Sequence, residues 1–116
     1  MQRMKDYVVD GQPYYLLLKG SEKGKIFFSF FDIFEYRVAL CSTTHKKFKI
    51  ELFDIEKKLL YSGSCEDYTK VLDLNFKSNI AGYIEVTCEN IGTIDPAFQI
   101  VIGFKELKDQ KNTKKE

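Results

Sequence analysis

The sequence predicts an all-β fold: a two-sheet antiparallel sandwich of about eight strands with a jelly-roll-like layout. Short runs of alternating apolar and polar residues recur every 8–12 residues or so, separated by glycine, serine and aspartate. So many one-sided strands cannot bury their apolar faces in a single sheet, whereas two packed sheets can bury them. With 116 residues and 44% hydrophobic side chains, the chain is long enough for one such domain.

The expected strands are recognised by period-two alternation, which sends one set of side chains to the core and the other to water. Gly20, Ser21 and Gly24 are expected to form the turn between the first two strands. A polar, lysine-rich stretch without periodicity follows the last strand, so the predicted division is a domain at 1–104 and a tail at 105–116. The strand ranges are 14–19, 25–31, 36–42, 47–52, 59–61, 72–76, 83–88 and 98–104.

Two stretches also fit a helix and have to be weighed against the strand interpretation. Asp32 and Glu35 have the spacing of a capping box, and apolar residues between Phe48 and Leu59 recur at helical spacing. The strict alternation of lysine, phenylalanine, lysine, isoleucine, glutamate and leucine over 47–52 favours strands. The prediction is therefore strand at both places.

Composition and charge exclude several classes of protein. There are 18 basic and 17 acidic residues, a net charge of +1, so the basic footprint of a nucleic-acid binder is absent. No apolar run approaches the roughly 18–20 residues that a membrane-spanning helix needs. No apolar stretch of signal-peptide type follows the basic residues of 1–10, so we expect either a cytoplasmic protein or a chain whose leader has been replaced by Met1.

The residues that could support catalysis or bind metal are few and scattered. His45 is the single histidine, and it is more typical of a polar turn than of a dyad with Cys41. The three cysteines, Cys41, Cys65 and Cys88, are too widely spaced for a usual zinc site, and they leave one disulfide plus a free thiol, or three thiols, as alternatives. The loop carboxylates match no ordered calcium loop. The prediction is a protein with no catalytic residue, no metal and no cofactor.

The order of the strands after Tyr36 carries a family resemblance. A hairpin containing Phe48 to Tyr61 is followed by a polar loop, by the alternating run 72–76, and by the pair Gly82-Tyr83 at the opening of the next strand. Over residues 25–104 this resembles the bacterial pre-peptidase C-terminal type of β-sandwich and small bacterial proteins of similar layout. The stretch 32–35 departs from the glycine-containing turn of that pattern. The resemblance implies a non-catalytic accessory module, often located outside the cytoplasm.

The strongest functional signal is an excess of apolar residues at positions that should face water. In the first strand Tyr15 and Leu17 share a face with Lys19, and in the second Phe27 and Phe31 share a face with Lys25. If the two strands are neighbours, these four residues form one exposed patch, and large exposed apolar patches mark interaction sites. The alternative is that another segment, such as 4–9, covers them.

Two functions are therefore expected, and both are binding functions. The first is a β-sandwich that acts through protein contact, as a homo-oligomer or with another protein, using Tyr15, Leu17, Phe27 and Phe31 as the interface. The second is a glycan- or small-ligand-binding module, with an exposed tyrosine such as Tyr83 as its platform, although tryptophan is absent. An enzyme that uses Cys41 and His45 is the third and least supported possibility.

Overall fold

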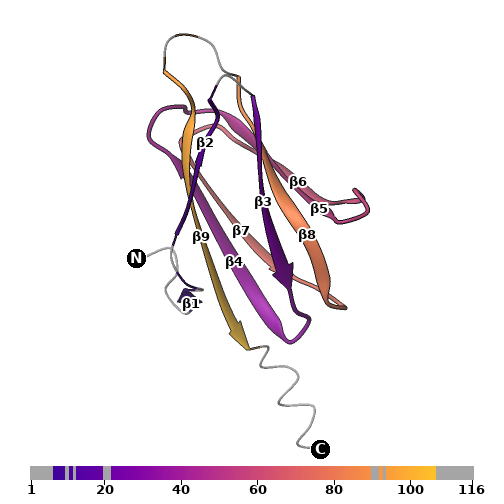
Figure 1. Cartoon of the computed structure of the whole chain (residues 1–116). Helices are drawn as coiled ribbons and strands as arrows, with labels where there is room; N and C mark the ends of the chain where they lie inside the picture. The colour runs from indigo at the N-terminus through magenta and orange to yellow at the C-terminus, as the bar shows by residue number, and fades with distance from the viewer. Residues whose placement is uncertain are drawn as a thin grey trace, which may run out of the picture.

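The computed structural model describes residues 7–9, 11, 13–19, 22–89, 92 and 94–106, and no described residue is helical. The described strands form two antiparallel sheets, which confirms the predicted all-β sandwich (Figure 1). Neither stretch that also fits a helix is helical: Phe34–Ser42 is a strand that follows a turn at Asp32, and residues 48–59 contain a strand, a turn and the start of the next strand. The strands are β1 (Val8–Val9), β2 (Tyr14–Leu17), β3 (Lys23–Phe30), β4 (Phe34–Ser42), β5 (Phe48–Asp54), β6 (Leu59–Cys65), β7 (Thr69–Asn75), β8 (Ile80–Thr87) and β9 (Ala97–Glu106).

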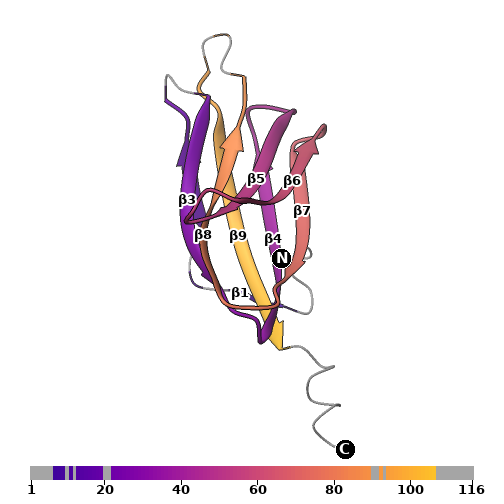
Figure 2. The same cartoon turned by 90° about the vertical axis from the view of Figure 1, so that its right-hand side faces the viewer.

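The two sheets are built from strands that alternate along the chain. The five-stranded sheet has the order β1-β9-β4-β7, with β2 also paired to β9, and the four-stranded sheet has the order β3-β8-β5-β6. If β2 to β9 are counted as strands one to eight, the sheets read 1-8-3-6 and 2-7-4-5. Among these strands, only β5 and β6 follow each other within one sheet. Figure 2 shows the molecule from the side of the four-stranded sheet, with β3 at the left and β6 at the right.

The core lies between the sheets and is made of the inward residues that the alternation predicts. Phe30, from β3, and Tyr36, from β4, meet with ring centroids 4.9 Å apart and join the two layers. Phe48 and Cys88, both predicted to face inward, are buried as expected. The side chains with no exposed surface are those of Phe30, Val38, Leu40, Ile50, Val86 and Ile100.

The boundaries of several strands differ from the sequence prediction. Gly24 was expected in a turn, which is wrong: it lies inside β3, where a Cβ atom would come within 2.6 Å of Leu18 Cδ2. A larger residue there would require the side chains of Leu16 and Leu18, which pack against Gly24, to shift. β1 is an additional short strand, β7 begins earlier than predicted, at Thr69, and β9 continues to Glu106. Residues 107–116 of the predicted tail lie outside the described residues.

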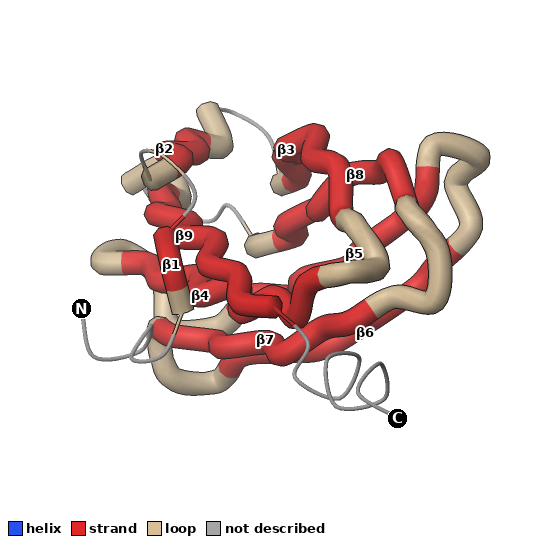
Figure 3. The backbone as a smooth tube through the Cα atoms, turned by 90° about the horizontal axis from the view of Figure 1, so that it is seen from below, coloured by secondary structure: helices blue, strands red, loops and turns tan. Residues whose placement is uncertain are grey.

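The edges of the sheets differ in how regular they are. β1 and β2 both pair with β9, but four residues separate Val9 from Tyr14, whereas two separate their partners Gly103 and Ile100. This edge is therefore interrupted. The β5–β6 pairing carries a register shift after Leu52, and β7 lies against β6 of the other sheet. By contrast, β3 pairs with β8 over eight residues without a shift. Figure 3 shows β2 and β3 at one margin of the sandwich and β6 and β7 at the other.

No membrane-spanning helix is present in the part of the chain that the structure describes. None of its segments forms a helix that is long and apolar enough to cross a bilayer.

Candidate functional site

The four residues predicted as an interface are all exposed, but they occupy different sheets. The exposed fractions are 74% for Tyr15, 55% for Leu17, 68% for Phe27 and 45% for Phe31. β2 pairs with β9 and β3 pairs with β8, so the two strands are not hydrogen-bonded neighbours. Tyr15 and Leu17 lie on the outer face of the five-stranded sheet, Phe27 on that of the four-stranded sheet, and Phe31 in the turn after β3. β2 and β3 contact each other at the margin of the sandwich, but they belong to different sheets, so the four residues do not share one sheet face.

An aromatic row crosses the outer face of the four-stranded sheet. Phe27, Tyr83 and Phe53 are direct cross-strand partners on β3, β8 and β5, and we call these three residues the aromatic row. The ring of Tyr83 stacks on Phe53 at 5.2 Å between centroids and meets Phe27 at 5.4 Å. The ammonium group of Lys25 lies 4.7 Å from the centre of the Tyr83 ring. Cross-strand aromatic pairs of this kind stabilise the sheet and fix its register.

Tyr83 was expected to be exposed, and this expectation is wrong. Its exposed fraction is 6%, because Phe27, Phe53 and Lys25 surround its ring on a face that would otherwise meet water. Phe27, at the end of the row, carries most of the exposed aromatic surface. The sequence prediction missed Phe53, although its parity with Lys49 and Glu51 on β5 already placed it on the outer face.

An open hollow of about 420 Å³ lies beside the aromatic row. It is lined by the apolar residues Phe27, Phe28 and Ile55 and by the small residues Ser29, Ala81 and Gly82. Two exposed apolar side chains extend this surface toward the β5–β6 turn. They are Ile55, which follows β5, and Leu59 on β6, the cross-strand partner of Phe53. The volume lies within the range of about 300–1,000 Å³ that is usual for binding pockets, although this one is open to solvent.

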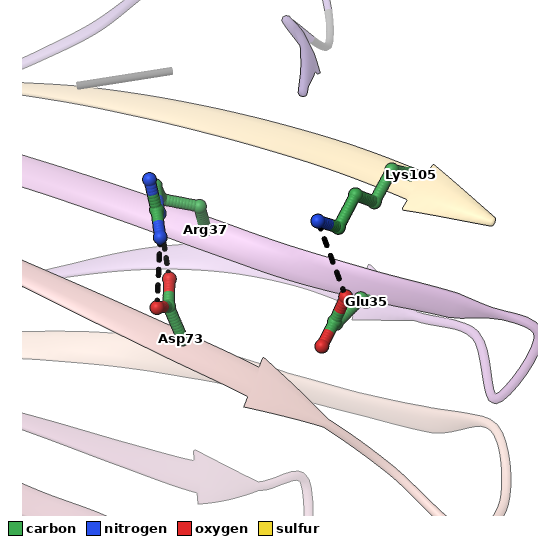
Figure 4. Close-up of polar contacts among 4 residues, drawn as sticks. All are labelled: Glu35, Arg37, Asp73 and Lys105. Atoms are coloured by element: carbon green, nitrogen blue, oxygen red, sulfur yellow. Dashed lines mark hydrogen bonds and ion pairs between the residues drawn. The ribbon is translucent and has the colours of Figure 1, made fainter. Parts of the chain in front are cut away.

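The outer face of the five-stranded sheet carries charged pairs instead (Figure 4). Arg37 donates two hydrogen bonds to Asp73, at 2.7 Å and 2.9 Å, and Lys105 lies 3.7 Å from Glu35. These pairs link β4 to β7 on one side and to β9 on the other. The hydrogen bond from Arg37 lowers the pKa of Asp73 despite the opposing effect of partial burial. This face is held by complementary charges across three strands.

Tyr7 covers the apolar centre of the same face. Its ring lies 4.7 Å from the Arg37 guanidinium and 4.7 Å from the Lys105 ammonium group, and it packs against Ala39 and Val101. Burial, followed by the charges of Asp73 and Glu35, raises the pKa of the Tyr7 phenol. The alternative that residues 4–9 cover the four predicted interface residues is wrong for the described part of that segment, because all four are exposed and Tyr7 covers Ala39 and Val101 instead. Residues 4–6 lie outside the described residues.

The candidate nucleophiles are held in structural roles. His45 Nδ1 lies 2.9 Å from Thr44 Oγ1, in a network with Ser42 that ties the β4–β5 loop to Ala97. All three cysteines are free thiols; Cys41 is half-buried on the five-stranded sheet, whereas Cys65 and Cys88 are buried at the four-stranded sheet. Burial raises the pKa of the Cys88 thiol, with Glu89 and Glu22 adding to the effect. A raised pKa disfavours the reactive thiolate.

The described residues also contain no cluster that suggests a bound metal. Nowhere in this part of the chain do three or more histidine, cysteine, aspartate or glutamate side chains gather as metal ligands would. Every buried side-chain nitrogen and oxygen among these residues has a hydrogen-bond partner. The polar interior is therefore satisfied by the protein itself.

Comparison with known proteins adds no family to these observations. No protein-family model matches the chain, and no curated protein matches it.

Proposed function

We propose that this protein is a non-catalytic β-sandwich module that acts through protein–protein contact at the outer face of the four-stranded sheet. The observation that carries the proposal is the aromatic row, which ends in the exposed Phe27 beside the open hollow. Together with Ile55 and Leu59 it forms an apolar surface on a folded sheet, and such surfaces mark contact sites. Aromatic residues at the centre of an interface commonly provide most of its binding energy.

A glycan-binding function is the second candidate and has less support. Sugars bind to exposed faces of aromatic rings, but both neighbours of Tyr83 lie against its ring and leave it 6% exposed. Phe27 offers an exposed ring without a hydroxyl group. Tryptophan is absent from the chain. The surface therefore favours an apolar side chain of a protein over a sugar ring.

The strand order is compatible with an accessory role. The orders 1-8-3-6 and 2-7-4-5 support a jelly-roll arrangement of two Greek keys, an arrangement that many binding proteins adopt. The resemblance to bacterial pre-peptidase C-terminal sandwiches points to the same kind of module, and a bacterial, extracytoplasmic setting belongs to this proposal through that resemblance alone. Because one fold serves many functions, the proposal of protein contact rests on the aromatic row.

The test compares one substitution on each outer face. Phe27→Asp places a charge on the proposed contact surface, whereas Tyr15→Asp makes the same change at a slightly more exposed aromatic residue of the other sheet. Immobilised wild-type and variant chains are used to capture proteins from source-cell extract, and the captured proteins are identified by mass spectrometry. We expect Phe27→Asp to lose a specific set of proteins that the wild type and Tyr15→Asp retain.

Two results would count against the proposal. Equal capture by Phe27→Asp and the wild type would remove the aromatic row as the contact surface. Saturable binding of an oligosaccharide from a glycan array, lost on Phe27→Asp, would instead favour the second candidate. Thermal melting of both variants controls for loss of the fold.

A further inference from the structure

The segment at the start of the described chain is held to the five-stranded sheet by few contacts. It consists of Tyr7, Val8 and Val9, which we call the strap. The strap pairs with β9 at two positions, Val8 opposite Phe104 and Val9 opposite Gly103, and the side chains of the two valines are 61% and 40% exposed. Segments with little buried apolar surface open locally at a low cost in free energy. We therefore expect the strap to open while the sandwich stays folded.

Only one of the two pairs between the strap and β9 is a hydrogen-bonded pair. Leu18 N–H donates to Pro96 C=O at 2.8 Å, and this pair continues the register of β2 with β9. Hydrogen-bonded pairs recur at every second residue of an antiparallel ladder, and β9 runs along β4 without a register shift from Phe98 to Glu106. The N–H and C=O groups of Phe104 therefore point toward the strap, whereas those of Gly103 point toward β4. Opening of the strap uncovers the backbone of Phe104 and leaves the pairing of β9 with β4 intact.

The connection from the strap to β2 has the features of a hinge. Gly11 has a positive φ of 73°, and a Cβ atom at this position would meet no other atom within 4 Å. The connection does not follow β9, since four residues separate Val9 from Tyr14 and two separate their partners. A few residues of this kind absorb the backbone rotation when a segment moves. The strap can therefore leave β9 without displacing β2.

The surface beneath the strap keeps its shape when the strap opens. Ala39 and Val101, on which the Tyr7 ring packs, belong to the paired strands β4 and β9. The two cations beside the ring are each paired with a carboxylate of the same sheet (Figure 4). An open strap thus leaves an apolar floor between two fixed cations, beside the uncovered N–H and C=O groups of Phe104. This arrangement can accept an extended segment that carries an aromatic side chain.

We propose that this surface is a strand-acceptor site, and that the strap of a second copy of the chain occupies it when the chain's own strap opens. The contacts of the folded chain identify the occupant, because the sequence Tyr7-Val8-Val9 already fills the site. The same three residues from another copy form the same contacts. Exchange of identical segments is a low-cost route to assembly, since each copy regains the contacts that it gives up. The site lies on the opposite sheet from Phe27 and is independent of the proposed function.

Amide hydrogen exchange of the wild type, followed by NMR, tests whether the strap opens by itself and needs no substitution. The N–H of Phe104 is covered by the strap, whereas those of its neighbours Gly103 and Ile100 are directed toward β4 and β2. We expect the protection factor of Phe104 to be lower than theirs by about tenfold or more, with a weaker dependence on urea. Equal protection of the three amides would mean that the strap opens only with the whole sandwich, which would overturn the proposal.

A peptide then tests whether the site accepts the segment from outside. A fluorescent peptide of residues 1–11 is titrated with full-length chains, and its anisotropy is measured. A chain with Tyr7→Ala has a weakened strap and an unchanged acceptor surface, so we expect it to bind the peptide about fivefold more tightly than the wild type does. The matched peptide with Tyr7→Ala should not bind. The Phe27→Asp chain, which is altered on the other sheet, should bind the native peptide as the wild type does.

Light scattering of full-length chains across a concentration series tests the second copy itself. Val8→Pro removes the strap N–H that faces Phe104, whereas Val8→Ala is the matched control that retains it. We expect the mass of the wild type and of Val8→Ala to rise from the 13.5 kDa of one chain toward twice that value, and Val8→Pro to stay at the single mass.

Three results would overturn this site. They are no peptide binding to the Tyr7→Ala chain, equal binding of the native peptide and its Tyr7→Ala form, and a wild type of single mass at every concentration. A dimer that persists in Val8→Pro and is lost in Phe27→Asp would also overturn it, and would place the contact on the four-stranded sheet in support of the proposed function. The failure of either proposal is therefore visible without the other.

Discussion

The apolar residues on the two outer faces of the sandwich are covered in different ways. On the five-stranded sheet the small residues Ala39 and Val101 are covered by Tyr7, which is held between Arg37 and Lys105. On the four-stranded sheet the aromatic row covers its own centre, since Phe27 and Phe53 flank Tyr83. Within the described residues, nothing packs over the outer side of Phe27, and its exposed fraction is 68%. The first face is closed by the chain itself, whereas the second ends in an open aromatic side chain.

This difference shows why exposure alone does not identify a contact surface. Tyr15, with an exposed fraction of 74%, is the more exposed residue, yet its hydroxyl group accepts a hydrogen bond from Gln99 on the neighbouring strand. Phe27 has no polar group, and it continues a row of rings toward an open edge. Apolar surface that is continuous with a packed row contributes more to binding than an isolated exposed ring.

The largest expected effect comes from adding a side-chain atom at Gly82, where two backbones approach closely beneath the aromatic row. A Cβ atom at Gly82 would clash with the carbonyl oxygen of Phe53 on the paired strand, and a backbone atom cannot move aside as a side chain can. Gly82→Ala should therefore lower the free energy of unfolding by about 3 kcal/mol. Urea unfolding measures the change, and the exposed neighbour Ala81, changed to serine, should stay within about 0.5 kcal/mol of wild type. Equal stability of the two variants would contradict the close approach.

An intermediate effect separates the two faces directly. Tyr83→Ala removes a ring that is buried among Phe27, Phe53 and Lys25, and these surface neighbours can partly close the gap, so we expect a loss of about 2 kcal/mol. Tyr7→Ala removes a half-buried ring held mainly by cation–π contacts, and we expect a loss of about 1 kcal/mol. Thermal or urea unfolding gives both values. If Tyr7→Ala is as damaging as Tyr83→Ala, the two faces are closed with equal strength and the contrast between them fails.

The smallest effect concerns the charged pairs and depends on pH. Arg37 lowers the pKa of Asp73 below its ordinary value of 3.8, so the folded chain binds the proton less readily than the unfolded chain does. The contribution of the pair is therefore complete above that ordinary value and is lost as the pH falls through the lower pKa of the folded state. Asp73→Asn should cost up to about 1 kcal/mol at neutral pH, because the carboxylate is half-exposed.

Urea unfolding at neutral and acidic pH tests this expectation. The difference between Asp73→Asn and the wild type should shrink at acidic pH, where the aspartate is protonated in both states. Glu66→Gln, which alters the exposed and longer pair with Lys47 at 3.8 Å, is the control and should show little effect at either pH. A difference that is constant with pH would mean that Asp73 acts through packing and not through its charge.

The alternation of single residues predicted much of the core and less of the surface. Phe48 and Cys88 were placed inside because their neighbours along the strand are polar, and both are buried. The same parity placed Phe27 outside, and it is exposed. The alternation along β5 also places Phe53 on the outer face, but the sequence prediction did not use this. It could not show that Tyr83, an outward residue, is buried by rings that come from two other strands.

Gly24 and β2 show where local reasoning fails. A glycine between polar residues is typical of a turn, but here it lies inside a strand, where the side chains of Leu16 and Leu18 pack against it. Two strands adjacent in sequence usually pair, yet β2 and β3 lie in different sheets. Both corrections depend on contacts between residues that are distant along the chain or across the sandwich.

By itself, the sequence determined that the protein is a β-sandwich and which residues of most strands face inward. The physical reason is that a strand has a period of two, so each polar–apolar alternation assigns its own faces. The tertiary structure alone decided which strands pair, which divided the predicted patch between two sheets and assembled Phe27, Tyr83 and Phe53 into a row. Pairing depends on long-range packing, because any one strand edge offers the same backbone donors and acceptors as another.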